Sequence, residues 1–429
     1  MAVPFLISIL VVQANVFADT FWISNLGERA VSGMTSSVPM YMVISSVGIG
    51  ISAGVVTTVA YRIGKGDLSI AGKLAGNAIT LSVIIAIVCS VVILLSEDIL
   101  ISVMGAEDVS TEIHDYLLPL LLLSPITVLN NVFGGMLRAE GAATRSTIVQ
   151  MSSVGLNMVL DPLLIFSLGM GIMGAGLATV LSYAFGICIS SLWYIRRKTM
   201  IEVHRKDLII SKEVSRELMN VGGARMVEGF VNNAVILFQR VFIIMASGTA
   251  GVMLFNVPFR YVTLSMCPVE ALGMSATPVI AANYGRSDKE KMRDASRYVI
   301  KLSLALALVL MVVLFLLSPF LIELFTLEES MLEWRDELVW NLGAYSVILP
   351  LFALQTISSS ILLSIKKSKV PMRVTMIVGV FRMVVFWLAV PFGFRGITVA
   401  LIFSYVLSCT LMFLLMRKYF TDACAQSGQ

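Results

Sequence analysis

The stretch Ser146–Phe166 reads STIVQMSSVGLNMVLDPLLIF and combines the length of a membrane span with an ionisable side chain. A helix of about 20 apolar residues crosses the hydrocarbon core of a bilayer. Asp161 lies inside this stretch, Asn157 precedes it by one helical turn, and Pro162 follows it directly. A carboxylate at bilayer depth is costly unless it faces a cavity, a partner or the protein interior, so Asp161 indicates an ion or proton site in a membrane protein.

The composition of the rest of the chain also indicates a polytopic membrane protein. Of its 429 residues, 58% are hydrophobic and 14% are charged, whereas soluble domains carry about 25% charged residues. No soluble domain fits between the apolar runs. We place twelve spans near residues 3–24, 34–60, 77–96, 116–137, 146–167, 171–195, 221–247, 252–282, 298–322, 338–364, 372–392 and 395–416.

The loops between these spans alternate in charge. The basic loops are 62–73, 138–145, 196–206, 286–293, 366–369 and 417–418. The acidic loops are 97–115 and 328–337. Because basic loops stay in the cytoplasm, we expect a multi-pass protein of the cell membrane with both termini in the cytoplasm.

Two motifs recur at an offset of about 220 residues and indicate an internal duplication. Gly64-Lys65-Gly66-Asp67 returns as Gly285-Arg286-Ser287-Asp288, and Gly174-x-x-x-Ala178-x-x-x-Ser182-Tyr183 returns as Gly396-x-x-x-Ala400-x-x-x-Ser404-Tyr405. Repeats of six spans share one orientation, an architecture found in secondary transporters. We therefore predict an all-α membrane fold with twelve helices in two parallel-repeat six-helix lobes around a central cavity. The predicted parts are an N-terminal lobe (1–195), a cytoplasmic linker (196–220), a C-terminal lobe (221–416) and a cytoplasmic tail (417–429).

The predicted orientation brings polar residues of the first half to one depth. Asp19, Asp161 and Thr179 lie about five, six and eight residues from the outer ends of their spans, or roughly 7–12 Å below the surface. Asn157 shares a helix face with Asp161. Asn157 and Thr179 alone would be hydrogen-bonding glue between helices, but two carboxylates indicate a site for Na⁺ or a shared proton. Pro162 removes a backbone hydrogen bond and offers a hinge.

Five ionisable residues lie in spans of the second half, namely Glu228, Arg240, Arg260, Glu270 and Arg382. Ionisable groups at bilayer depth either pair with each other or face a cavity. One interpretation is a structural ion-pair network. The other is a substrate-facing wall, for which Glu270 and Glu228 are the candidates because an acid attracts a cationic compound.

The chain resembles the multidrug and toxic compound extrusion (MATE) transporters over essentially its whole length. The matching residues are Val3-Pro4, Ala18-Asp19-Thr20, Gly27, Gly48-x-Gly50, Gly64-x-Gly66-Asp67, Leu137-Arg138-Ala139-Glu140-Gly141, Asn157-x-x-x-Asp161-Pro162 and Gly174-x-Gly176-x-Ala178-Thr179. The resemblance implies that the cation or proton site of the N-terminal lobe consists of Asp19, Asn157, Asp161 and Thr179. Relatives of the NorM type carry acids in spans seven and ten, but 338–364 holds none, so the chain looks closer to the DinF-like branch.

We therefore predict a secondary antiporter that exports organic, often cationic, compounds (multidrug efflux) in exchange for H⁺ or Na⁺ by alternating access. The alternative is a flippase for a lipid-linked oligosaccharide or related amphiphile, which the arginines of the second half would suit. An ion channel or a membrane-embedded enzyme has less support. We expect no enzymatic activity, no cofactor besides the coupling ion and no nucleic-acid partner. The expected partners are small organic cations or amphiphiles and membrane lipid, and the expected state is a monomer.

Overall fold

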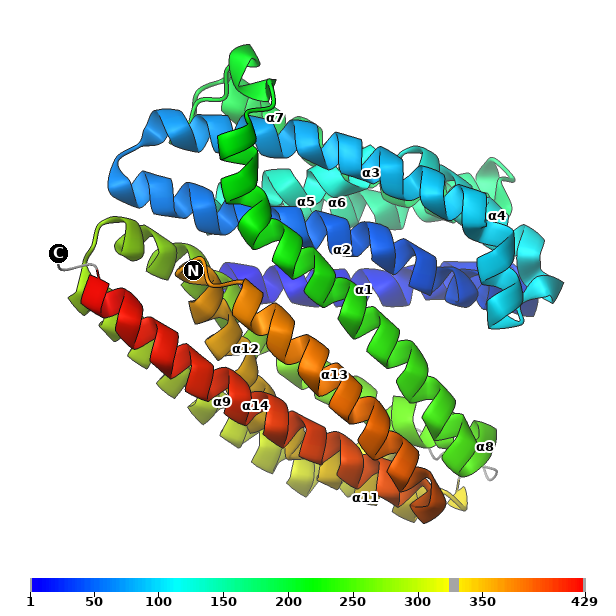
Figure 1. Cartoon of the computed structure of the whole chain (residues 1–429). Coiled ribbons are helices and arrows are strands. Elements are labelled where there is room, and N and C mark those ends of the chain that lie inside the picture. Colours follow the sequence, from blue (N-terminus) through cyan, green and yellow to red (C-terminus); the bar gives the residue numbers. More distant parts are fainter. Residues whose placement is uncertain (1, 324–331, 427–429) are drawn as a thin grey trace. The chain divides into compact units, whose positions relative to one another are not determined.

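The computed structural model describes residues 2–323 and 332–426. Part of the acidic loop 328–337 and the end of the tail 417–429 therefore lie outside the described residues. Every regular element among the described residues is a helix, and none of them is a strand (Figure 1). This confirms the predicted all-α class.

The helices of the first half are α1 (Ala2–Ser24), α2 (Glu28–Lys65), α3 (Leu68–Met104), η1 (Glu107–Val109), α4 (Ser110–Leu122), α5 (Ser124–Ala139), α6 (Ala143–Pro162), η2 (Leu163–Ser167), α7 (Gly171–Ile195) and η3 (Arg205–Leu208). Those of the second half are α8 (Lys212–Gly285), α9 (Lys289–Glu323), α11 (Arg335–Ser346), α12 (Ile348–Ser364), α13 (Lys369–Ala389), η4 (Val390–Phe392) and α14 (Gly393–Gln426). Helix α2 ends at Gly66, whose φ of 87° is the left-handed conformation that glycine adopts without strain.

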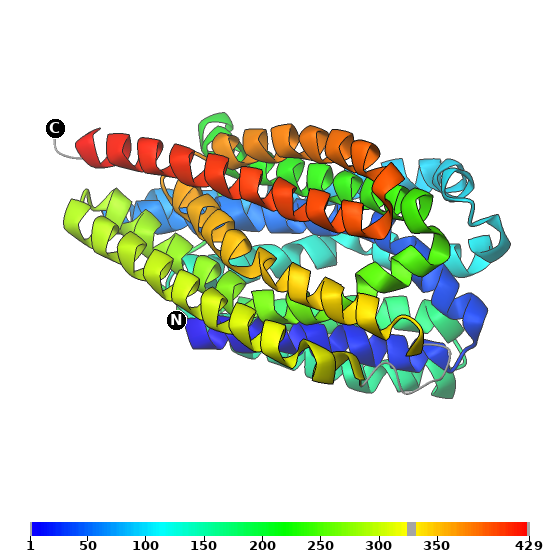
Figure 2. The same cartoon turned by 90° about the horizontal axis from the view of Figure 1, so that it is seen from below.

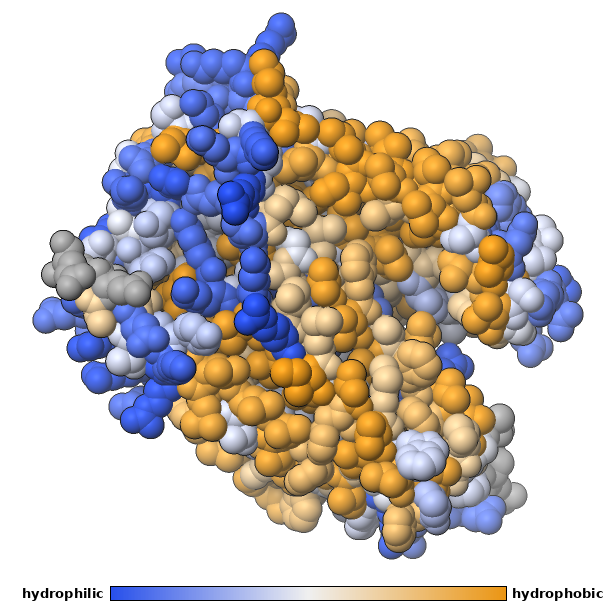
Figure 3. Space-filling model, viewed as in Figure 1, coloured by the Kyte–Doolittle hydropathy of each residue, from blue (hydrophilic) through white to orange (hydrophobic). Residues whose placement is uncertain are grey.

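The spans among the described residues agree with the prediction of twelve. Ten helical segments are long and apolar enough to cross a membrane, and the bent pair formed by α4 and α5 makes an eleventh. One of the ten, Lys369–Ala425, contains both α13 and α14 and therefore provides two spans. On the face that Figure 3 shows, hydrophobic side chains cover the middle of the helices, while hydrophilic side chains gather toward helix ends.

Several spans depart from a simple straight helix. The predicted span 116–137 is broken at Leu123, where η1 and α4 meet α5 at an angle of 55°. Pro125 occupies the first turn of α5, where its missing N–H costs nothing. The segment labelled α8 contains spans seven and eight as two helical arms, because Ser247 and Gly248 between them have non-helical backbone angles.

The chain forms two compact units, one holding Val3–Gly229 and the other beginning at Phe230. In the first unit, α2 is the central helix and packs against α3, α4 and α5. In the second unit, α14 packs along α12 and α13, while α9 packs against α11 and α12 (Figures 1 and 2).

The segment between α7 and α8 is fastened to α3. The side-chain amide of Asn77 donates to the carbonyl oxygens of Asp207 (3.0 Å) and Ile209 (3.2 Å). Its oxygen accepts from Ser211 N (2.8 Å) and Ser215 Oγ (3.0 Å). Helix α8 begins at Lys212, so the predicted linker 196–220 consists of the segment 196–211, called the strap below, and the first nine residues of α8.

Candidate functional site

The structure brings the two sequence-predicted aspartates together. Asp19 lies in the last turns of α1, and Asp161 is the last residue but one of α6. Asp161 is 1% exposed, and its carboxyl group lies close enough to that of Asp19 for the two groups to interact. Two ionised carboxylates that lie close together repel each other, so such a pair favours a form in which one of them holds a proton. The pair can therefore store one proton.

Each aspartate is also bound by an asparagine one helical turn before it. Asn157 Nδ2 donates to Asp161 Oδ1 at 3.3 Å. Asn15 Nδ2 lies 3.2 Å from Asp19 Oδ1 and 3.1 Å from Asp19 Oδ2. Both contacts follow from the i, i+4 spacing on one helix face. Asn15 was not singled out from the sequence, although its spacing from Asp19 is the same as that of Asn157 from Asp161.

Three oxygen atoms at this site are buried without a hydrogen-bond partner among the described residues, namely Asn15 Oδ1, Asn157 Oδ1 and Asp161 Oδ2. A buried acceptor without a partner costs about 1–3 kcal/mol. Carboxylate and amide oxygens are the ligands that hard cations prefer. The residues present therefore suit a bound cation as well as a shared proton.

Tyrosines from three further helices surround the aspartate pair, and sequence reasoning missed this role. Tyr41 of α2 and Tyr183 of α7 lie close enough to interact with each other, and both also interact electrostatically with Asp19. Tyr116 of α4 lies within the same range of both aspartates. Tyr183 belonged to the repeated motif, but no local pattern distinguishes Tyr41 or Tyr116 from other aromatic residues of the spans.

Thr179 and Pro162 lie on α7 and α6, two of the helices that carry this cluster. The Thr179 hydroxyl donates to the carbonyl of Ala175 on its own helix at 3.1 Å, so its part in cation binding stays a prediction. Helix α6 ends at Pro162, and the chain continues as the π-helix η2. A Cβ atom on Gly174 would lie 2.8 Å from the backbone carbon of Leu164, so η2 packs closely on α7.

The two acids proposed to face substrate differ in their surroundings. Glu228 is 6% exposed, and its Oε1 atom forms an ion pair with Arg225 Nη1 at 2.6 Å. Glu270 is exposed on the second arm of α8. The structure therefore shows Glu228 in a structural pair, and the role of both acids in substrate binding stays a prediction.

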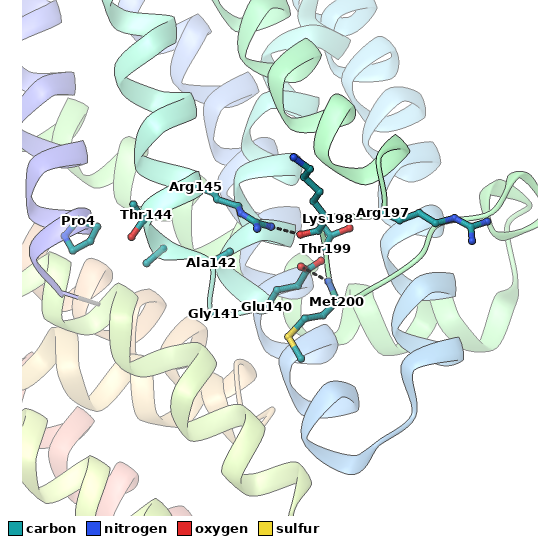
Figure 4. Close-up of a pocket in the computed structure, with 11 residues that line it drawn as sticks. Pro4, Glu140, Gly141, Ala142, Thr144, Arg145, Arg197, Lys198, Thr199 and Met200 are labelled. Atoms are coloured by element: carbon teal, nitrogen blue, oxygen red, sulfur yellow. Dashed lines mark hydrogen bonds between the residues drawn. The ribbon is translucent and has the colours of Figure 1, made fainter.

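A polar pocket of about 660 Å³ lies where α5, α6 and the strap meet (Figure 4). Glu140 accepts hydrogen bonds from Tyr194 Oη (3.0 Å) and from the Met200 backbone N–H (2.9 Å). Arg145 donates to the carbonyl oxygen of Lys198. Burial raises the pKa of the Glu140 carboxyl, and the hydrogen bonds from Met200 and Tyr194 oppose that shift. These contacts fasten the strap to α6 and to the turn between α5 and α6.

Comparison with known proteins supports a transporter. A family model described as MatE matches residues 4–163 and 227–388. The chain is 28% identical to an FAD transporter of Shewanella oneidensis over 82% of its own length and 77% of that protein. It is 23% identical to the multidrug export protein MepA of Staphylococcus aureus, over 77% of its own length and 74% of MepA.

Solved structures give the same result. A MOP superfamily transporter from Pyrococcus furiosus matches with a TM-score of 0.92 and 26% identity, covering 99% of this chain and 95% of that one. A MATE structure in the bent conformation matches with a TM-score of 0.93 and 26% identity, over 100% of this chain and 96% of that one.

Proposed function

The chain belongs to the MatE family of membrane transporters, and from that premise we propose that it is a secondary antiporter that exports organic compounds in exchange for H⁺ or Na⁺. Its two six-helix lobes would alternate between outward- and inward-open states, as a monomer with both termini in the cytoplasm. Acids are absent from 338–364, which favours the DinF-like branch over the NorM type.

The observation that carries this proposal is the aspartate pair of the first unit. Two carboxyl groups that lie close together are each bound by an asparagine, and three oxygen atoms of these four residues are buried without partners among the described residues. Such a site changes its charge when it takes up or releases a cation. Coupling requires only that the cation binds the two transport states with different affinity.

The relatives point to two substrate classes. MepA is a multidrug export protein, whereas the Shewanella relative is an FAD transporter. Export of a flavin dinucleotide is therefore the second candidate function, and the arginines within spans of the second unit favour it. The lipid-linked oligosaccharide flippase would use the same arginines but gives no role to the aspartate pair.

The test is efflux from proteoliposomes with an H⁺ or a Na⁺ gradient imposed in turn. Replacing Asp19→Asn or Asp161→Asn should lower gradient-driven efflux by at least about tenfold, because a neutral amide cannot exchange a cation. Asp98→Asn is the matched control, since Asp98 is exposed at the end of α3, and its efflux should equal wild type. Wild-type efflux by both site variants would refute the coupling site.

A further inference from the structure

The polar pocket at the start of α6 carries more positive than negative charge. All of its lining residues belong to the first unit. They come from the start of α1, the turn between α5 and α6, the first turn of α6 and the strap. The charged residues among them are Arg145, Arg197, Lys198 and Glu140. With three basic residues and one acid, the pocket suits an anionic group.

The acid of this pocket already has partners for both of its oxygen atoms. Glu140 Oε1 accepts a hydrogen bond from Tyr194 Oη, and Oε2 accepts one from the Met200 backbone N–H. Figure 4 shows the second of these bonds, which joins the turn before α6 to the strap. Arg145 also interacts electrostatically with the Glu140 carboxyl group. The negative charge of Glu140 is therefore balanced within the pocket.

Lys198 and Arg145 are the basic residues that remain available to a ligand. The Lys198 side chain is exposed and forms no ion pair within the described ranges. Arg145 donates one hydrogen bond to the carbonyl oxygen of Lys198 and lies 5.7 Å from the centre of the Trp193 ring, but a guanidinium group has further N–H donors. Arg197 differs, because its Nε atom lies 3.9 Å from Glu202 Oε1 and its side chain points away from the pocket in Figure 4.

The first turn of α6 adds backbone N–H donors to the same pocket. Ala142 is the residue before the helix, so no side chain caps this end, and the first turn contains no acid. The first N–H groups of a helix have no partner within the helix. Ala143, Thr144 and Arg145 carry these groups and line the pocket. Such N–H groups bind phosphate well, and here they lie beside the two basic side chains.

Helix α1 closes the pocket on the side away from the strap. Thr147 Oγ1 donates to the carbonyl oxygen of Pro4 at 2.8 Å, and Ser8 Oγ donates to Thr147 Oγ1 at 2.9 Å. These bonds hold the start of α1 against α6. In Figure 4, Pro4 and the strap lie on opposite sides of Arg145. The pocket is therefore a cavity between a membrane helix and the strap.

An exposed apolar face of α6 leads away from this pocket. Thr144 lines the pocket and is exposed. Ile148, Met151 and Val159 share its helix face and are exposed as well. Exposed apolar patches of this kind are typical of membrane contact. A molecule with a phosphate group at one end and apolar chains at the other would contact the pocket and this face together.

We propose that this pocket binds the phosphate group of an anionic phospholipid through Lys198, Arg145 and the first N–H groups of α6, while the acyl chains lie along the exposed face of α6. Basic pockets between membrane helices hold such headgroups, and charge-assisted hydrogen bonds to phosphate are stronger than bonds between neutral groups. Both loops that form the pocket are basic and lie on the side predicted to face the cytoplasm. The bound phosphate links the strap to α6, at a site separate from the aspartate pair.

The test titrates the purified full chain in detergent with dioleoylphosphatidylglycerol and with dioleoylglycerol, which has the same acyl chains but no phosphate, and measures bound lipid by native mass spectrometry. We expect the phospholipid to bind at least about tenfold more tightly, because it adds charge-assisted hydrogen bonds. Lys198→Gln and Arg145→Gln should each lower that preference several-fold while dioleoylglycerol binding stays the same. Lys206→Gln changes an exposed lysine of the strap that does not line the pocket, and it should bind both lipids as wild type does.

Equal affinity for the two lipids, or an unchanged preference in both glutamine variants, would overturn the proposal. Arg145→Lys keeps the charge and should retain part of the preference, which separates a lost phosphate contact from a change in the fold. A third probe, glycerol 3-phosphate, carries the phosphate without the chains and should not displace the phospholipid at equal concentration. Displacement at equal concentration would refute the lipid and indicate a site for soluble phosphate esters.

Discussion

At the scale of single residues, the aspartate site is built from two short-range pairs that meet in space. Asn157 with Asp161 and Asn15 with Asp19 each follow from four-residue spacing on a helix. The sequence predicts such pairs because a helix fixes their geometry. Tyr41, Tyr116 and Tyr183 come from three other helices, and only the packing of those helices brings them to Asp19.

Asn15 offers a sharp test at this scale, because it is the partner of Asp19 that no motif indicated. Replacing Asn15→Leu removes a hydrogen-bond donor to both carboxylate oxygens and a buried oxygen that a cation could use. We expect a several-fold higher cation concentration for half-maximal efflux, with substrate binding unchanged. Gln13→Leu, two residues away on α1, is the control. An identical cation dependence in wild type and Asn15→Leu would show that Asn15 has no part in the site.

At the scale of elements, the change from α6 to the π-helix η2 occurs where the sequence predicted a hinge. Pro162 cannot donate its backbone hydrogen bond, which disfavours a continuous α-helix. We expect Pro162→Ala to lower efflux several-fold while the unfolding temperature stays equal or rises, since proline inside a helix costs about 3 kcal/mol.

The matched control for this change is Pro371→Ala. Pro371 lies in the first turn of α13, where no hydrogen bond is lost, so neither efflux nor stability should change. Wild-type efflux in Pro162→Ala would show that the π-helical turn is not needed for transport.

The conformation of the strap between α7 and α8 was the feature least predictable from the sequence. Its mixture of basic and apolar residues gives no period, and its position depends on Asn77 of α3, more than a hundred residues earlier in the chain. The break of the fourth span at Leu123 was also missed, because its hydropathy is continuous across the break. The span count and the duplication could be predicted, since apolar length and motif spacing are local properties of the sequence.

Asn77→Ala tests how the strap is held. The change removes four hydrogen bonds to the strap and the start of α8 and leaves buried polar groups without partners, at about 1–3 kcal/mol each. We expect faster cleavage by trypsin within 196–206 and a lower unfolding temperature. Ser96→Ala, which loses only a bond to its own helix, should resemble wild type. Equal cleavage rates would mean that other contacts hold the strap.

At the scale of the whole molecule, the chain forms two compact units, and charged residues lie within spans of both. The first unit carries Asp19 and Asp161, and the second carries Arg240 and Arg382. From the sequence alone these arginines were also compatible with a structural ion-pair network. The absence of acidic partners among the described residues is a property of the three-dimensional structure, so it could not be predicted from residue types.

Cation movement that accompanies substrate movement, measured in a single proteoliposome preparation, tests the proposed antiport most directly. Proteoliposomes containing the full chain, with an internal indicator for H⁺ or Na⁺, receive substrate without any imposed gradient. The account predicts that substrate movement drives cation movement in the opposite direction in wild type and that Asp161→Asn shows none. Cation movement of wild-type size in Asp161→Asn, or substrate movement in wild type with no cation movement, would contradict it.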